Sequence, residues 1–146
     1  MATVRDLLRS KPGDIWTVRP DATVYEALKL MAEKNIGALP VVDEHGQLIG
    51  IFSERDYARK VMLQGRTSRE THIGEVDTSP VYTVTERDQI ESCMALMTEA
   101  RVRHLPVLQD ERLVGIISIG DVVKSIMDDQ RVFINDLEAY ITGVKR

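Results

Sequence analysis

The stretch GALPVVDEHGQLIGIFSERD at residues 37–56 recurs later in the chain as RHLPVLQDERLVGIISIGD at residues 103–121. The run Leu-Pro-Val moves from position 39 to position 105, while the run Gly-Ile moves from position 50 to position 115. One residue is lost between EHGQ and DER, where a hairpin turn tolerates a change of length. A repeat of about 45 residues, at roughly 15–60 and 81–126, therefore organises the chain.

Each copy of the repeat predicts the element order β-α-β-β-α. The first helix is indicated by apolar residues spaced i, i+3, i+4 and i+7, namely Val24, Ala27, Leu28 and Met31. Capping pairs are predicted for both helices, Thr23 with Glu26 and Asp88 with Glu91. Strands are expected at 15–18, 38–42 and 48–52, and again at 81–84, 104–108 and 113–118, each set followed by a closing helix. Because one copy is too small for its own core, we expect an α+β fold in which the two units pack sheet to sheet as one pseudo-twofold module.

The remaining segments divide the chain further. Unit 1 is assigned to residues 10–64 and unit 2 to residues 81–127, joined by the polar linker 65–80. A short leading helix is predicted at 3–9. The tail, 128–146, predicts a helix with Gly143 as its C-cap and with one apolar face, formed by Phe133, Leu137, Tyr140 and Ile141. Such a stripe must dock on the module or on a second chain, so we expect a homodimer.

Composition excludes several classes of protein. The chain has 146 residues, 19 basic and 23 acidic, and a net charge of -4, which argues against a general nucleic-acid binder. No apolar run approaches the ~20 residues that span a bilayer, and the first ten residues lack the apolar core of a signal peptide. A cytoplasmic location without membrane association is the resulting expectation.

Residues for catalysis are hard to assemble. The three histidines, His45, His72 and His104, fall in a turn, the linker and a strand, without the spacing of metal ligands. Cys93 is the only cysteine and lies on an apolar helix face, as a packed core thiol would. P-loop, G-x-S-x-G and G-x-G-x-x-G motifs are missing from the sequence. The sequence thus favours a protein that is not an enzyme and that holds no metal and no catalytic cofactor.

The junction between the second strand and the closing helix carries the most informative motif. It reads Ser53-x-x-Asp56 in the first copy and Ser118-x-x-Asp121 in the second. One interpretation is a capping box, in which each serine and aspartate only start a helix. The other is a ligand site: a helix N-terminus accepts phosphate, a carboxylate one turn later can hold both hydroxyls of a ribose, and Arg55 can pair with phosphate. The sequence leaves both interpretations open.

With GALPVVD at 37–43, RHLPVL at 103–108 and Gly-Ile-x-Ser-x-x-Asp in both copies, the chain resembles the cystathionine β-synthase (CBS) domain family. The tandem arrangement is similar to a Bateman module, and about 110 residues share the resemblance. It implies a regulatory module that binds adenosine-containing ligands (AMP, ADP, ATP, NAD or S-adenosylmethionine) in clefts between its two units.

The same resemblance implies two sites, each combining the aspartate of one unit with the adenine wall of the other. The first would contain Ser53, Arg55, Asp56, Val81, Tyr82, Arg103 and His104. The second would contain Ser118, Asp121, Ile15, Trp16, Gly37, Ala38, Leu39 and Pro40, with Lys11 within reach of phosphate. Since the second junction lacks an equivalent of Arg55, AMP or the adenylate half of a dinucleotide would suit it better than a triphosphate.

Three functions follow as hypotheses. A ligand-sensing module that binds an adenine nucleotide (AMP, ATP or NAD) and signals to a separate, unidentified protein is the principal one. A structural adaptor would use the Ser-x-x-Asp pairs only as caps. A small enzyme acting on nucleotides is the third, and it lacks an evident base or metal.

Overall fold

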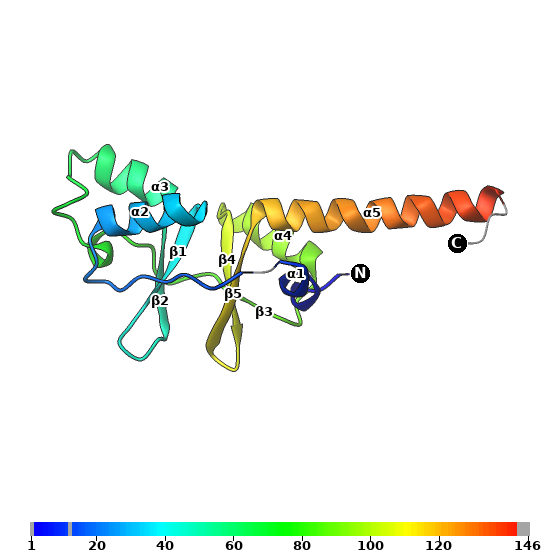
Figure 1. Ribbon diagram of the computed structural model, residues 1–146, viewed down its shortest axis with the longest axis horizontal. Coiled ribbons are helices and arrows are strands. Elements are labelled where there is room, and N and C mark those ends of the chain that lie inside the picture. The colour runs from blue at the N-terminus through cyan, green and yellow to red at the C-terminus, as the bar shows by residue number, and fades with distance from the viewer. Residues whose placement is uncertain (1, 12, 143–146) are drawn as a thin grey trace.

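The computed structural model describes residues 2–11 and 13–142 as two α+β units with a long helix projecting from one end (Figure 1). The first unit comprises α2 (Val24–Lys34), β1 (Ala38–Val42), β2 (Leu48–Ser53), α3 (Glu54–Asp56) and a π-helical continuation, η1 (Tyr57–Met62). The second comprises β3 (Val84–Thr85), α4 (Ile90–Ala100), β4 (His104–Gln109), β5 (Arg112–Ser118) and α5 (Ile119–Thr142). Two short helices complete the described elements, α1 (Val4–Ser10) and the 3-10 turn η2 (Ile73–Glu75). The α+β class is confirmed.

The two hairpins repeat one register. β1 pairs antiparallel with β2, placing Leu39 opposite Phe52, and β4 pairs antiparallel with β5, placing Leu105 opposite Ile117. Both hairpins carry a register irregularity after the fourth residue of their first strand. All four of these side chains are fully buried, so the repeated apolar pattern fixes which face of each hairpin meets the core.

The leading strands are shorter than predicted. Residues 15–17 belong to no strand, and Val18 forms only an isolated parallel bridge with Val41. In the second unit, the strand predicted at 81–84 is reduced to the two residues of β3, which pair parallel with β4. In the first unit, residues 15–17 belong to the segment that crosses from α1, which packs on the second unit, to α2 (Figure 1).

Of the two predicted helix caps, one is present. Thr23 Oγ1 accepts a hydrogen bond from the Glu26 backbone N–H at 3.1 Å. The pair of Asp88 and Glu91 is wrong as a cap, because Asp88 Oδ2 accepts the Thr85 N–H at 2.8 Å and so closes the preceding turn. The carboxylate is therefore occupied one turn before the helix that it was expected to start.

Each unit has its own apolar core, and the N-terminal helix contributes to the core of the second. The first core contains Val18, Val24, Ala27, Met31, Leu39, Val41, Phe52, Val61, Ile73 and Val76. The second contains Val4, Leu7, Val84, Ile90, Cys93, Met97, Leu105, Val107, Ile117 and Val122. Val4 and Leu7 come from α1, so the beginning of the chain stabilises its second half.

Residues 65–80, expected to be a polar linker, include part of the first core. Thr71, Ile73 and Val76 are buried. Further along, Thr78 forms an antiparallel bridge with Ile51 at the edge of the first hairpin. The segment connects the two units, but its middle packs as a structural part of the first.

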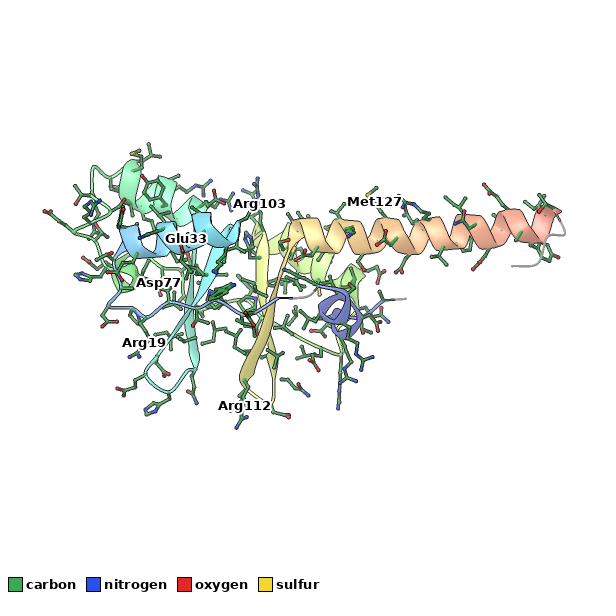
Figure 2. All side chains as sticks on the ribbon, in the orientation of Figure 1. Arg19, Glu33, Asp77, Arg103, Arg112 and Met127 are labelled. Atoms are coloured by element: carbon green, nitrogen blue, oxygen red, sulfur yellow. The ribbon has the colours of Figure 1, made fainter. Side chains whose placement is uncertain are left out.

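The closing helix of the second unit and the tail form one helix, α5, because no Gly or Pro interrupts residues 121–142. Beyond the label Met127 in Figure 2 this helix leaves the body of the protein. Phe133 is 67% exposed and Tyr140 86%, so the expected docking of the tail on its own module is not observed. The alternative, docking on a second chain, remains a prediction. The predicted cap at Gly143, and residues 143–146, lie outside the described residues.

Candidate functional site

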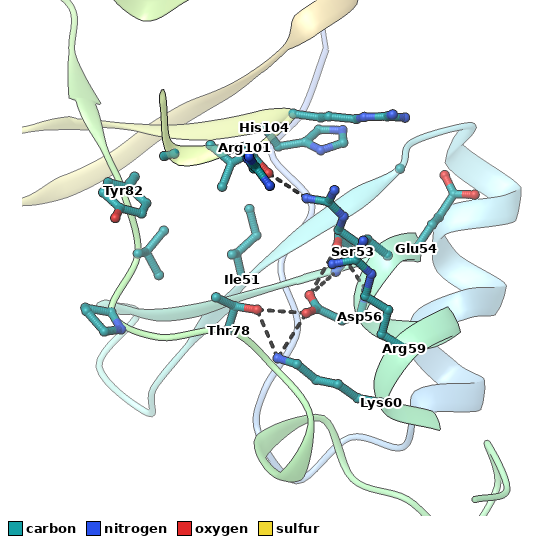
Figure 3. A pocket seen from close by; sticks show the side chains of 17 residues that line it. Ile51, Ser53, Glu54, Asp56, Arg59, Lys60, Thr78, Tyr82, Arg101 and His104 are labelled. Atoms are coloured by element: carbon teal, nitrogen blue, oxygen red, sulfur yellow. Dashed lines mark hydrogen bonds and ion pairs between the residues drawn. The ribbon is translucent and has the colours of Figure 1, made fainter. Parts of the chain in front are cut away.

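A pocket of about 750 Å³ opens between the two units. One wall comes from the end of β2, from α3 and from η1, and the other from residues 78–82 and 100–104 (Figure 3). Small-molecule sites in proteins have typical volumes of roughly 300–1,000 Å³ and a mixed apolar and polar lining. The pocket fits that description and is the candidate ligand site.

Asp56 is the buried charge of this pocket, with 7% of its surface exposed. Its Oδ2 accepts hydrogen bonds from Ser53 N at 2.9 Å and from Ser53 Oγ at 3.1 Å. Its Oδ1 accepts a bond of 2.7 Å from Thr78 Oγ1 and lies 3.1 Å from Lys60 Nζ. A carboxylate offers about four lone-pair sites, so all of them are used. Asp56 therefore caps α3 and also joins this helix to residue 78.

Arg55 connects the two units across the pocket. Its Nη1 donates a hydrogen bond of 2.6 Å to the backbone oxygen of Arg101, which lies just after α4 (Figure 3). Arg101 adopts the left-handed conformation, with φ of 56°, which turns the chain out of α4 and toward the pocket. Because this hydrogen bond joins the two units, a shift of one unit relative to the other would change the shape of the pocket between them.

All seven residues predicted for the first site line this pocket, namely Ser53, Arg55, Asp56, Val81, Tyr82, Arg103 and His104. Tyr82 is 55% exposed and lies on the side of the pocket opposite Asp56 and Arg59 (Figure 3). With Pro80, Val81 and Val102 it provides an apolar surface that can receive a planar ring.

His104 and Gly37 meet where the two units touch. A Cβ on Gly37 would lie 2.9 Å from Glu54 Oε1 and 3.3 Å from the His104 ring, so a larger residue there would have to displace both side chains. Burial lowers the pKa of His104, and the nearby positive charge of Lys11 lowers it further. The imidazole is thus held in its neutral form, able both to donate and to accept a hydrogen bond.

The second Ser-x-x-Asp junction has different contacts. Ser118 N donates to Asp121 Oδ2 at 2.9 Å, as in the first unit, but Lys11 Nζ also bonds this oxygen, at 2.6 Å. Burial raises the pKa of Asp121, yet the hydrogen bonds from Lys11 and Ser118 outweigh burial, and the pKa is lowered overall. Among the described residues, Asp121 Oδ1 has no hydrogen-bond partner.

Of the residues predicted for the second site, Asp121 and Lys11 line a groove of about 460 Å³ at this junction, whose remaining walls come from α1 and α5. Ala38, Leu39 and Pro40 are buried in β1, and Gly37 lines the first pocket. Ile15 is 37% exposed, and Trp16 stacks under the ammonium group of Lys34, 4.1 Å from its ring centre. The difference between the two junctions follows from the crossing segment, which brings Lys11 to the second.

Several residues of the first pocket were missed by sequence reasoning. Arg59 and Lys60 lie one helical turn after Arg55 and Asp56, a spacing that could have identified them. Thr78 could not be identified from a sequence motif, because it lies in the polar segment that was predicted to be a linker. Arg101 could not be recognised without its left-handed backbone conformation, which places it at the pocket.

Other chemistry receives little support from the described residues. Within residues 2–11 and 13–142, no group of three or more His, Cys, Asp or Glu side chains could hold a metal ion. Cys93 is fully buried in the second core, and burial raises its pKa to about 11, which opposes formation of a thiolate. In the same part of the chain, none of the helices combines the length and the apolar character needed to span a bilayer.

Comparison with known proteins gives one consistent answer. The family model described as CBS domain matches residues 4–63 and again 73–128. The mitochondrial CBS domain-containing protein CBSX3 of Arabidopsis thaliana is 41% identical over 150 residues, which cover 97% of this chain and 72% of the relative.

Solved structures agree. A protein with CBS domains from Burkholderia ambifaria MC40-6 superposes with a TM-score of 0.84 at 52% identity, covering 88% of this chain and 96% of that chain. The CBS domain pair of protein MJ0100 superposes with a TM-score of 0.77 at 28% identity, covering 88% and 98%. That domain pair was crystallised in complex with 5′-methylthioadenosine and S-adenosyl-L-methionine.

Proposed function

The chain belongs to the CBS domain family, and we propose that it is a non-catalytic module that senses an adenosine-containing ligand in the pocket around Asp56. It would pass the signal to a separate protein. The observation that carries this proposal is the position of Asp56, a buried carboxylate in a pocket of about 750 Å³ that both units line. The complex of the MJ0100 domain pair with two adenosine derivatives supports the ligand class.

The contacts of Asp56 indicate how a ribose would bind. Since its four lone-pair sites are filled, the two ribose hydroxyls would replace the hydroxyl of Thr78 and the ammonium group of Lys60 on Oδ1. The adenine would lie on the apolar surface that includes Tyr82. Ligand binding would then favour one relative position of the two units, because it contacts both. This change of position is the signal in the proposed function.

The test is binding of AMP and 2′-deoxy-AMP by the wild type and by Asp56→Ala, measured by titration calorimetry. We expect the wild type to bind 2′-deoxy-AMP roughly ten- to a hundredfold more weakly than AMP, and the variant to lose most of this difference. Asp136→Ala, on the projecting part of α5, is the control. Equal affinity of the wild type for the two nucleotides would show that ribose recognition at Asp56 is wrong.

A structural adaptor is the second candidate function, and the filled hydrogen-bonding sites of Asp56 favour it. In an adaptor, Asp56 would only cap α3 and hold Thr78. Asp56→Ala would then cost on the order of 1 kcal/mol of stability. No adenosine ligand would raise the melting temperature of the wild type, whereas a ligand of the sensing module raises it by mass action.

The proposed module acts as a homodimer. The support is the apolar stripe of the projecting helix, where Phe133, Tyr140 and Ile141 are each more than two-thirds exposed. Large exposed apolar surfaces of this kind mark sites of protein association.

A further inference from the structure

The pocket around Asp56 has an excess of positive charge in a protein that is negative overall. Five cationic side chains line it, Arg55, Arg59, Lys60, Arg101 and Arg103, against two carboxylates, Glu54 and Asp56. The whole chain has a net charge of -4. A cleft lined by charge of one sign concentrates ligands of the opposite sign. The pocket is therefore suited to an anion.

Two of the five cations already have partners. Lys60 Nζ lies 3.1 Å from Asp56 Oδ1 and also donates to the backbone oxygen of Asp77 at 3.2 Å. Arg55 donates to the backbone oxygen of Arg101 at 2.6 Å. Both side chains are therefore engaged in the structure without ligand, and the unpartnered positive charge of the pocket comes from the other three residues.

The other three guanidinium groups are free. Throughout the described residues, the side chains of Arg59, Arg101 and Arg103 form no hydrogen bond and no ion pair. They come from both walls, Arg59 from η1 and the other two from the residues between α4 and β4 (Figure 3 labels Arg59 and Arg101). A guanidinium group binds phosphate through two parallel hydrogen bonds. Three such groups exceed what one phosphate needs.

We infer that the pocket selects adenosine ligands that carry a phosphoanhydride, that is, two or more linked phosphates, and that Arg59 and Arg101 determine this specificity. The inference rests on the proposed function, since it names the ligand class of the same site. Adenosine has no group for these arginines, and S-adenosylmethionine offers them one carboxylate together with an ammonium and a sulfonium that they repel. The single phosphate of AMP can pair with only some of these arginines. ADP, ATP and NAD share the pyrophosphate that the arrangement fits.

The experiment is titration calorimetry of the full chain with adenosine, AMP, ADP, ATP, NAD, S-adenosylmethionine and inorganic tripolyphosphate at one ionic strength. We expect ADP to bind at least tenfold more tightly than AMP, and AMP more tightly than adenosine. The pyrophosphate can come from a nucleotide or from a dinucleotide, and the affinities for ATP and NAD show which of the two the pocket prefers. The gain from AMP to ADP should shrink as salt is added, because it is electrostatic.

Variants assign the effect to the arginines. Arg59→Gln and Arg101→Gln should each weaken ADP about tenfold and AMP much less, so that the ratio of the two affinities falls toward one. Arg112→Gln, at the tip of the second hairpin far from the pocket, is the matched control (Figure 2). If the variants weaken ADP and AMP equally, the arginines do not determine specificity and the inference is overturned.

The ligand series separates this inference from the proposed function. Adenosine or AMP binding as tightly as ADP would overturn the inference and leave adenosine sensing intact. Tripolyphosphate binding as tightly as ATP, without a contribution from adenosine, would support the arginine site and overturn adenosine sensing. Absence of binding by every compound would overturn both.

Discussion

Lys11 Nζ lies 2.6 Å from Asp121 Oδ2, so the chain itself supplies a cation to the carboxylate that corresponds, in the second repeat, to Asp56. The same ammonium group donates to the backbone oxygen of Ile116 at 3.1 Å. Two equivalent aspartates in the repeat thus have different partners. Asp56 is bonded by groups of its own unit and its connecting segment, and Asp121 by a residue that follows α1.

The first prediction concerns this ion pair. In Lys11→Ala the pKa of Asp121 should rise, because burial is then opposed only by the bonds from Ser118. The wild-type carboxyl has a lowered pKa, so it contributes stability above its unfolded value, and this contribution is lost as pH falls through the folded value. Both side chains are partly exposed, so the variant should lose under about 1 kcal/mol of stability at neutral pH.

Carboxyl-detected NMR titration measures the change directly. Lys124→Ala is the matched control, because Lys124 lines the same groove but, within the described residues, makes no ion pair with Asp121. An Asp121 pKa that is the same in Lys11→Ala and the wild type would contradict the structure.

The second prediction concerns two glycines of the repeat. A Cβ on Gly50 would fall on the carboxylate of Asp77 and lie 3.3 Å from the backbone oxygen of Thr78. Gly50→Ala should therefore cost about 1–3 kcal/mol, since Asp77 and the strand edge must move. In Gly120→Ala the nearest atom, Ser118 Oγ, would be 3.6 Å away, and the protein should gain about 0.4–1 kcal/mol because the unfolded chain loses conformational freedom.

Urea unfolding of both variants measures the two effects with opposite signs. A Gly50→Ala protein as stable as the wild type would mean that Asp77 does not pack over this glycine in solution.

Much of the fold could be predicted because its signals are local and occur twice. The hairpins and the start of each closing helix follow from alternating apolar residues and from the Ser-x-x-Asp junctions. The crossing segment could not be predicted, because the position of α1 is set by packing of Val4 and Leu7 against the other half of the chain. Sequence periodicity carries no information about which unit a helix will join.

The same distinction separates the two candidate sites. The residues of the first pocket were gathered by the resemblance to the CBS family, which pairs the Ser-x-x-Asp junction of one unit with residues before β3 and β4 of the other. The second depended on Ile15 and Trp16 behaving as the leading strand of a repeat. In the structure these residues form no strand, Trp16 stacks under Lys34, and Lys11 bonds Asp121.

The third prediction is a pH dependence that involves His104. Burial lowers its pKa below the usual 6.5, with Lys11 and Arg103 adding to the effect and Asp121 opposing it. As pH falls below 6.5, the unfolded chain binds a proton that the folded protein excludes, so stability decreases until the folded pKa is reached. Above that window the contribution is fully present.

Thermal unfolding of the wild type and His104→Gln between pH 7.5 and 5 would measure it, and the variant should lose less stability on acidification. His45→Gln, in the exposed turn of the first hairpin, controls for an ordinary surface histidine. Parallel pH profiles for the wild type and His104→Gln would contradict a half-buried, neutral imidazole.

The last prediction concerns the projecting half of α5. Phe133, Leu137 and Tyr140 are spaced i, i+4 and i+7 and therefore lie on one face of α5. Within residues 2–11 and 13–142, this half of the helix projects away from the body of the protein (Figure 1). Tyr140 is 86% exposed, and an isolated amphipathic segment of this kind is stabilised mainly by packing of its apolar face. A second copy of the chain would supply such packing, because in a twofold dimer the apolar face of each α5 covers that of the other. Light scattering at micromolar concentration should give twice the 16.5 kDa of one chain.

Phe133→Ser combined with Leu137→Ser should convert this dimer to a monomer, because both changes remove apolar area from the stripe. Asn135→Ser is the matched control, since residue 135 lies on the opposite face of the helix, and it should leave the mass unchanged. A wild-type mass of 16.5 kDa would exclude the dimer, and a double variant that remains dimeric would place the interface elsewhere. Because α5 begins at the second Ser-x-x-Asp junction, pairing through its projecting half would connect the Asp121 grooves of two chains by one continuous helix from each.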